Sequence, residues 1–429
     1  MTGLTLFTMF FGAGNLIFPP LMGASAGNRV WSAFLGFSIT AVGVPVLGVA
    51  AAARVGGLER LAGRVHPKFA LFFTTILYLA MGPCLTIPRT ASISYSMAME
   101  PFTDGRFQNW LLLAYSTIFF VIASAIAWKP EKLTDKLGKI IAPCLLILLL
   151  VITLKCVPGI KPEYGDAVIP YAENPFRCGM LDGYQTMDTI AALLFGIVMP
   201  LNIRAMGVKE EKNLIRETIL AGLFAGVLML VIYGLLVNAG AVEGSEGETC
   251  SSGARILSDL SERLYGGWGI LILSVVFMLA CLSTGAGLLC CCSEYFSGVF
   301  PRLSYRRWLL FFGGLSLCLA NTDPGEISQV SEMVLNVFYP AAVVLILLSF
   351  LPGGMQEARA LYPTAAGTAV LINLCYLLEK GGFSMGRICR FLHKIPFYED
   401  GFGWIVGAAV SVLFCLLISV SPFRKSVVE

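Results

Sequence analysis

Glycines and prolines interrupt the first apolar stretch of the chain. The stretch FFGAGNLIFPP, residues 10–20, carries two glycines, an asparagine and two prolines. Glycine destabilises a helix interior by about 1 kcal/mol relative to alanine, and proline by about 3 kcal/mol. A break in a membrane helix frees backbone N–H and C=O groups, which must then face protein, water or a ligand. Freed N–H groups suit a carboxylate, and freed carbonyls at the end of a half-helix suit a cation.

A second apolar stretch, residues 182–203, is interrupted in a similar way. It carries Phe195-Gly196 and then Pro200, as the first stretch carries Phe11-Gly12 and then Pro19. Five apolar spans separate the two starts, so the two stretches enter the membrane from opposite sides. Gly/Pro-interrupted spans at matching positions predict an inverted repeat and the binding site of a transporter. The alternative is that both are kinked or closely packed helices, because glycine and proline are common in membrane helices.

The elements that must position these breaks are membrane helices. Of the 429 residues, 57% are hydrophobic and 13% are charged, and the mean hydropathy is +0.78, whereas soluble domains carry about 25% charged residues. A membrane span needs about 20 apolar residues, which predicts an all-α protein with about twelve transmembrane helices. These lie near residues 2–26, 31–53, 69–98, 107–127, 138–156, 182–203, 214–240, 267–296, 306–320, 329–350, 363–380 and 402–421.

We expect one transporter domain built from two five-helix repeats. The first repeat is residues 2–156, the second is 182–350, and two additional helices occupy 363–421. Most lysines and arginines fall in loops on one face, which predicts that both termini are cytoplasmic. The basic loop at residues 380–401 is an exception on the other face, and its SMGRICRFLHKI segment could be an interfacial helix.

Several other functions lack the residues that they need. No basic tail indicates nucleic acid, and the sequence has no P-loop for ATP. The two histidines, His66 and His393, fall in different loops, so no transition-metal site is expected. A channel should show a repeated filter loop or charged rings, and a membrane enzyme should show a nucleophile with its base or a metal cluster. Neither is evident, whereas a sensor that keeps a transporter fold remains an alternative.

Five segments of the chain are similar to one known family. FFGAGNLIFPP, GVPVLGV, YLAMGPCLTIPRTASISY, GYQTMDTIAALLFGIV and FMLACLSTGAGLLCCCSEYF resemble the branched-chain amino acid:cation symporters, and the likeness covers nearly the whole chain. The resemblance implies a LeuT-like fold and uptake of leucine, isoleucine and valine at the cell membrane. It implies Na⁺, or alternatively H⁺, as the coupling ion, and no other cofactor. The family usually has a hydrophilic lead before the first span; here the lead is either truncated or absent.

The resemblance also implies which residues bind the substrate. The substrate would lie between the two breaks, with backbone amides near Ala13 and Gly14 on its carboxylate and an apolar pocket around its side chain. Such a pocket discriminates by only about 1–3 kcal/mol per methylene, which would allow three similar substrates. The candidates are Gly12, Ala13, Gly14 and Asn15 on the first span and Phe195, Gly196 and Ile197 on the sixth.

Adjacent hydroxyls in the eighth span are candidates for the cation site. Ser283 and Thr284 lie mid-span within ACLSTGAG. With backbone carbonyls near Thr8 and Phe11, they would supply the oxygen ligands that a hard cation prefers. The alternative is that both hydroxyls only bond the carbonyls four residues earlier in their own helix.

Two ionisable residues inside spans are candidates for gating or coupling, because charges within spans are rare and usually functional. Asp188 precedes the second break; it could bind a cation, carry a proton or gate the entrance, or it could only cap its helix near the interface. Arg89 in the third span should face the interior, and a pair with Asp188 is one hypothesis. Glu332 and Glu294, near span ends, fit interfacial or gating positions.

Overall fold

The computed structural model describes residues 1–103, 107–155, 164–244, 252–322, 325–356, 360–382 and 386–420, and these described residues form helices and no strands. The first half of the chain contains α1 (Thr2–Phe10), α2 (Ala13–Ala26), α3 (Val30–Ser38), α4 (Val44–Val55), α5 (Leu58–Gly63), α6 (Pro67–Leu79), α7 (Thr86–Ala98), α8 (Gln108–Ala127), α9 (Leu133–Lys136) and α10 (Ala142–Leu154). The second half contains α11 (Pro175–Gln185), α12 (Asp188–Phe195), α13 (Met199–Ala205), α14 (Glu211–Glu243), α15 (Gly253–Tyr265), α16 (Gly267–Val299), α17 (Tyr305–Asn321), α18 (Gly325–Leu348), α19 (Gly353–Gln356), α20 (Leu361–Lys380), α21 (Arg387–Leu392) and α22 (Gly403–Val420).

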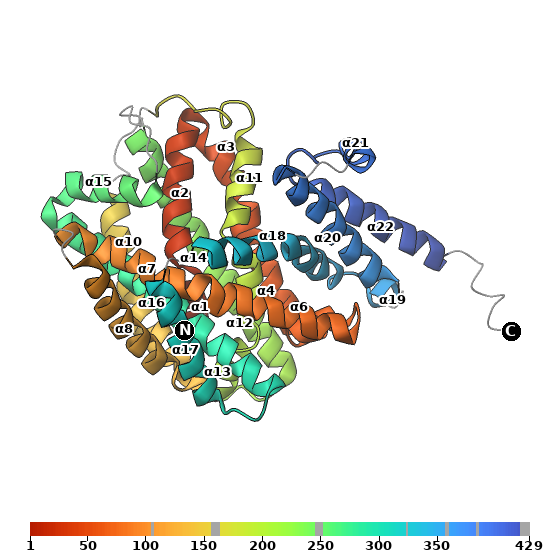
Figure 1. Ribbon diagram of the computed structural model, residues 1–429, viewed down its shortest axis with the longest axis horizontal. Coiled ribbons are helices and arrows are strands. Elements are labelled where there is room, and N and C mark those ends of the chain that lie inside the picture. The colour runs from red at the N-terminus through yellow and green to blue at the C-terminus, as the bar shows by residue number, and fades with distance from the viewer. Residues whose placement is uncertain are drawn as a thin grey trace.

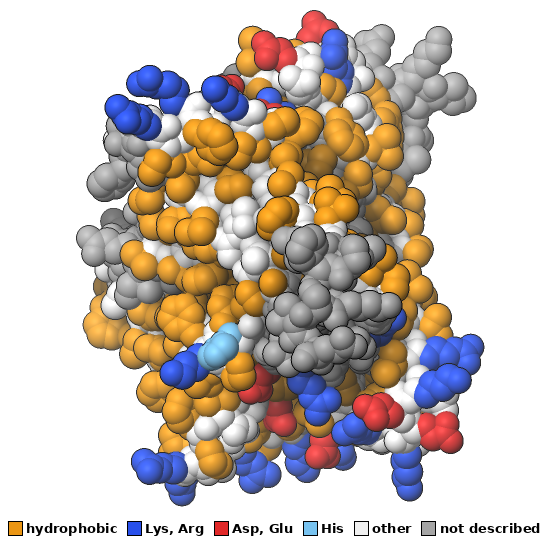
Figure 2. Space-filling model, turned by 90° about the vertical axis from the view of Figure 1, so that its right-hand side faces the viewer, with side chains coloured by type: hydrophobic (Ala, Val, Ile, Leu, Met, Phe, Trp, Pro, Cys, Tyr) orange, Lys and Arg blue, Asp and Glu red, His pale blue; other side chains and the backbone are white. Residues whose placement is uncertain are grey.

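Membrane-spanning helices dominate this arrangement. Within the described residues, seven helical segments are long and apolar enough to cross a membrane, or eight if the bent pair Pro175–Phe195 and Met199–Ala205 counts as one span. One segment, Ala13–Val55, holds parts of two predicted spans, because the chain stays helical through the reversal near Gly27. The multi-pass class is confirmed, whereas the number twelve and the division into repeats stay predictions. Figure 2 shows hydrophobic side chains across the middle of one face and charged ones mostly toward its upper and lower ends.

The first predicted break is present. Helix α1 ends at Phe10, and Gly12 is extended, with φ −101° and ψ −165°, before α2 begins at Ala13. Pro19 and Pro20 do not contribute to the break, because α2 continues through both of them. The glycine, and not the proline pair, therefore marks the interruption.

The sixth span is broken twice. The helix stops between α12 and α13 at residues 196–198, where the sequence predicts a break, and the pair bends by 48° there. It also stops between α11 and α12, where Met187 has a left-handed backbone with φ 57°. The sequence did not predict this second interruption, because no glycine or proline marks it and non-glycine residues rarely adopt that conformation.

The third span, predicted as one helix over 69–98, is also interrupted. A π-helical turn, η3 (Ala80–Cys84), separates α6 from α7, and Gly82 and Leu85 depart from helical geometry. A side chain on Gly82 would overlap the sulfur of Cys292 on α16. The close approach of α16 therefore explains the glycine at this position.

Long helices enclose the broken ones. Helix α12 is buried at every position, and α14 and α16 run along α2 and α7 respectively. Figure 1 shows α2, α3 and α11 side by side, with α20 and α22 as a pair at one side next to α18. The broken helices, and hence their exposed backbone groups, lie inside the bundle.

Glycines bring α14 against α2. A Cβ at Gly240 would overlap the carbonyl oxygen of Pro20. Because this oxygen belongs to the backbone of α2, it cannot easily move away. We therefore expect Gly240→Ala to destabilise the protein by about 1–3 kcal/mol through overpacking, measured by thermal unfolding in detergent. The matched control is Gly367→Ala in α20, where no atom lies within 4 Å of the added Cβ and stability should rise by up to about 1 kcal/mol. Equal shifts for both variants would contradict this packing argument.

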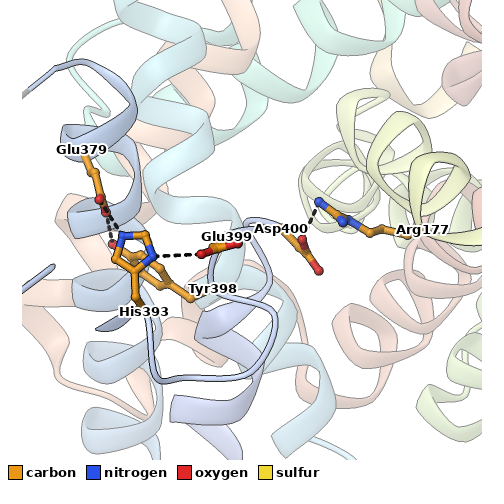
Figure 3. A network of polar contacts seen from close by, with 6 residues as sticks. All are labelled: Arg177, Glu379, His393, Tyr398, Glu399 and Asp400. Atoms are coloured by element: carbon orange, nitrogen blue, oxygen red, sulfur yellow. Dashed lines mark hydrogen bonds and ion pairs between the residues drawn. The ribbon is translucent and has the colours of Figure 1, made fainter. Parts of the chain in front are cut away.

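A charged network joins the segment between α20 and α22 to the bundle (Figure 3). His393 Nε2 lies 2.7 Å from Glu379 Oε1 and its Nδ1 lies 3.2 Å from Glu399 Oε1, and the Tyr398 hydroxyl donates to Glu379 at 3.1 Å. Asp400 forms an ion pair with Arg177 of α11. The predicted helix in the basic loop is present as α21, although residues 383–385 lie outside the described part.

This network predicts a pH-dependent stability. Hydrogen bonds to Glu379 and then Glu399 raise the pKa of His393 above 6.5. Because the folded pKa exceeds the unfolded one, the contribution is complete below about pH 6.5 and is lost as the pH rises through the raised value. We expect the Tm of the protein to fall over that interval, and His393→Gln to remove this part of the dependence. A Tm profile unchanged by the substitution would refute the role of His393.

Candidate functional site

A cavity of about 310 Å³ opens where the first and sixth spans are broken. Its walls come from both sides of the first break, from both sides of the break between α11 and α12, and from α7, α16 and α18. The residues singled out in the sequence that line it are Gly12, Ala13, Gly14, Asn15, Arg89, Asp188, Phe195, Thr284 and Glu332. The other lining residues are Met9, Phe10, Phe18, Met81, Leu85, Thr86, Thr90, Gln185, Thr186, Met187, Ala191 and Leu288.

The start of α2 supplies backbone donors at this cavity. The first N–H groups of any α-helix have no partner within the helix. In α2 these belong to residues that line the cavity, beginning with Ala13 and Gly14. No side chain caps this end of α2. The helix dipole adds partial positive charge here, so the arrangement suits a carboxylate.

A buried carboxylate lies beside these donors. Asp188 is 4% exposed, and its Oδ2 accepts a 2.6 Å hydrogen bond from Asn15 Nδ2 and a 3.5 Å bond from the Tyr233 hydroxyl. Asn15 also bonds the Tyr233 hydroxyl. The three side chains come from α12, α2 and α14, so one polar cluster ties both broken spans to a long helix.

Arg89 does not pair with Asp188, which corrects one hypothesis from the sequence. No ion pair joins these two described residues, and the hydrogen-bonding partners of Asp188 include the neutral Asn15 and Tyr233. Arg89 is instead exposed at the cavity, to which α18 contributes the exposed Glu332. The kink at η3 changes the direction of the chain before α7. The position of Arg89 therefore cannot be predicted from the straight helix that the sequence suggests.

An oxygen cluster lies where α1 ends. Ser283 Oγ is 3.0 Å from the carbonyl oxygen of Thr8, and Thr284 Oγ1 is 3.4 Å from the same oxygen. Ser283 also bonds Leu279, the carbonyl four residues earlier in its own helix, at 2.9 Å. Ser283 therefore contacts the α1 carbonyl that the cation-site hypothesis requires, and it also makes the bond within its own helix that the alternative requires. A Cβ at Gly12 would lie 3.0 Å from Thr284 Oγ1, so the glycine lets this hydroxyl approach the break.

The oxygens of this cluster are of the kind that a hard cation prefers. Phe11, the remaining cation-site candidate, follows the last residue of α1 and is fully buried. No group of three or more His, Cys, Asp or Glu side chains that could hold a metal ion occurs in the described part of the chain.

Gly196 and Ile197 lie elsewhere. They line a second cavity of about 310 Å³ that also involves Arg60 and Arg204, and a Cβ on Gly196 would overlap the side chain of Ala52. Only Phe195 of the predicted trio lines the first cavity, where its ring packs edge-on against Phe10 at 5.2 Å. The neighbouring residues Phe195 and Gly196 therefore line different cavities.

The residues that sequence reasoning missed are those of the other break. Gln185, Thr186 and Met187 line the first cavity in the place assigned to Gly196 and Ile197. Their signal in the sequence is polarity, because Gln185, Thr186 and Asp188 fall within four residues near the start of the predicted span. Polar groups in spans usually face a cavity or the bundle interior.

Solved structures place the fold in a known class. MhsT in complex with L-phenylalanine aligns with 98% of this chain and 98% of its own, at a TM-score of 0.54 and 16% identity. Mhp1 in its inward-facing conformation aligns with 97% of this chain and 90% of its own, at 0.56 and 12% identity. These likenesses confirm the predicted LeuT-like fold, the architecture of membrane transporters with broken helices.

Sequence comparison then gives the family. The family described as "Branched-chain amino acid transport protein" matches residues 1–421. The branched-chain amino acid permease BraB of Bacillus subtilis (strain 168) is 36% identical over 425 residues, 98% of this chain and 96% of the relative. The permease BrnQ of Salmonella typhimurium is 34% identical and BrnQ of Escherichia coli (strain K12) is 33% identical, each covering 97% of this chain and 94% of its own. The chain belongs to this family of transport proteins, and it is a multi-pass membrane transporter rather than an enzyme.

Proposed function

We propose that this protein imports leucine, isoleucine and valine by symport with Na⁺, through alternating access to the cavity at the two breaks. The observation that carries the proposal is that the α2 N-terminus and Thr284 line one cavity, and that Thr284 Oγ1 lies 3.4 Å from the carbonyl oxygen of Thr8. An amino acid needs the first of these groups and a coupling cation needs the second. The family and the names of its relatives support the substrate class.

The cavity also fits the rest of a branched-chain amino acid. The carboxylate binds the N–H groups of Ala13 and Gly14, and the side chain packs against apolar residues of the same cavity, among them Met81, Leu85 and Phe195. An apolar pocket of this type discriminates only weakly among leucine, isoleucine and valine, because one methylene changes the binding free energy by about 1–3 kcal/mol. One carrier therefore serves all three substrates.

Both termini face the cytoplasm in this proposal. The basic loops at residues 54–68, 129–139, 204–216 and 302–307 support this orientation through the positive-inside rule. The second cavity, lined by Arg60 and Arg204, is then the cytoplasmic exit. Phe195 separates it from the substrate.

Proton coupling through Asp188 is the second candidate, favoured by one observation. Asp188 is a buried carboxylate that lies directly at the cavity, and its hydrogen-bonding partners there, Asn15 and Tyr233 among them, are neutral. A carboxylate in such a place could exchange a proton during transport. A non-transporting sensor on the same fold is the remaining alternative.

Uptake of [³H]leucine into proteoliposomes tests the proposal. With the full-length protein, imposed inward Na⁺ and pH gradients are compared separately, and unlabelled isoleucine and valine are added as competitors. Accumulation that needs inward Na⁺ and is inhibited by both competitors supports Na⁺ symport. Accumulation driven by a proton gradient alone supports proton coupling through Asp188. Saturable leucine binding without transport indicates a sensor. No saturable leucine binding or uptake overturns the substrate assignment.

A further inference from the structure

A groove between α8 and α17 lies outside the candidate site. It has a volume of about 540 Å³ and shares no lining residue with the cavity at the breaks. Its walls are largely apolar, with Phe120 and Val121 from α8 and Leu310 and Leu317 from α17. Val121 is 64% exposed and Leu310 is 57% exposed, as expected for side chains that face lipid.

Positive charge gathers at one end of this groove. Lys129, Lys132 and Lys136 line it there, next to Trp128, and the Arg306 guanidinium lies 5.2 Å from the centre of the Trp128 ring. Lys136 donates to the last carbonyls of α8, at 3.2 Å for Ile126.

Acidic groups on the same segment only partly offset this charge. Asp135 is engaged with Lys139 at 2.6 Å, and Glu131 is exposed in the short turn that holds Lys132. Lys129 and Lys132 are both exposed. The groove mouth therefore carries a net positive charge.

The segment that carries the lysines is anchored to the bundle. Asn202 of α13 donates to the Pro130 carbonyl at 2.9 Å and accepts from the Thr134 N–H at 3.0 Å. Asn202 is 1% exposed. The lysine cluster is thus held at a fixed place on the groove by a residue of the broken sixth span.

We propose that this groove binds an anionic phospholipid, with its phosphate at Lys129, Lys132 and Arg306 and one acyl chain along α8 and α17. The occupant follows from the two halves of the site: the apolar half faces hydrocarbon, and the charged half is complementary to a phosphodiester at the cytoplasmic surface. Basic pockets between membrane helices on that side are suited to anionic headgroups. A free phosphate would leave the apolar half unused.

Glycine supplies the room for the acyl chain. Gly314 of α17 lines the groove, and no atom lies within 4 Å of a Cβ built there. A phenylalanine at this position would therefore project into the groove without a backbone clash. It would block the chain and leave every lysine in place.

Native mass spectrometry of the detergent-purified full-length protein tests the proposal. Phosphatidylglycerol, phosphatidylcholine and inorganic phosphate are titrated separately. We expect phosphatidylglycerol to bind most tightly and each charge removed in Lys129→Gln/Lys132→Gln to weaken it about fivefold. Gly314→Phe should weaken it with the charges intact. The control Lys209→Gln/Lys212→Gln, on the exposed segment before and at the start of α14, should bind normally.

Three results would overturn the proposal. Equal binding of the two phospholipids removes the charge selectivity. Equal losses in the test and control lysine pairs indicate general attraction to a basic surface. Inorganic phosphate that binds as well as the lipid, with no effect of Gly314→Phe, indicates an anion site without an acyl chain. None of these measurements requires transport, so failure here is distinct from failure of the leucine assay.

Discussion

Asp188→Asn is expected to lower leucine accumulation by roughly 10- to 100-fold. The substitution keeps the shape of the side chain, but it removes the charged acceptor of the bonds from Asn15 and Tyr233. A hydrogen bond to a charged group contributes about 1.5–3 kcal/mol, and each 1.4 kcal/mol corresponds to a factor of ten. The initial rate of [³H]leucine uptake in proteoliposomes measures the loss.

The control for this variant is Asp182→Asn. Asp182 lies on the neighbouring α11, where it accepts from Tyr171, and it does not line the cavity. We expect Asp182→Asn to retain uptake and both variants to elute as folded protein. Normal uptake by Asp188→Asn would show that the cluster is dispensable. Retained exchange of leucine with loss of gradient-driven accumulation would identify Asp188 as the coupling group.

Ser283→Ala and Thr284→Ala are expected to raise the Na⁺ concentration for half-maximal uptake by about tenfold or more. Each removes one oxygen near the Thr8 carbonyl, and a lost ligand costs at least as much as a lost hydrogen bond to a charged group, about 1.5–3 kcal/mol. The measurement is leucine uptake as a function of external Na⁺ at a saturating leucine concentration.

The same helix offers a matched control. Ser293 is fully buried in α16, and its hydroxyl donates to Leu289, four residues earlier, at 2.6 Å. Ser293→Ala removes the same hydroxyl from the same helix but touches no residue of α1 in the bonds described. If it changes the Na⁺ dependence as much as Ser283→Ala does, the two serines have only the local role of bonding their own helix.

The structural context makes the two predictions separable. Asp188 lies on α12 and the hydroxyls lie on α16, and they contact opposite sides of the first break, Asn15 after it and Thr8 before it. Loss at Asp188 alters how the broken spans are held together. Loss at Ser283 or Thr284 alters the oxygens at the end of α1. At one fixed Na⁺ concentration, each single variant lowers leucine uptake by some factor. If the two sites act independently, the double variant should lower uptake by about the product of these two factors.

Much of the architecture follows from local sequence. Long apolar runs with few charges can only be satisfied as membrane helices, because an unpaired backbone group in hydrocarbon is costly. Gly12 predicted the first break because glycine weakens a helix wherever it is placed. The same rule located the break at residues 196–198. These features depend on the chemistry of neighbouring residues, which the sequence states directly.

Tertiary structure decided which residues meet. Met187 adopts a left-handed conformation that its own side chain does not favour, so the surrounding bundle imposes the second interruption of the sixth span. Asn15 and Asp188 are 173 positions apart, and no local pattern shows that they bond each other rather than Arg89. The chain by itself determined that helices would break and that polar groups would be buried. Packing of α12 among α1, α4, α16 and α18 decided which break faces the cavity, because backbone and side-chain groups find their partners only when distant helices come together.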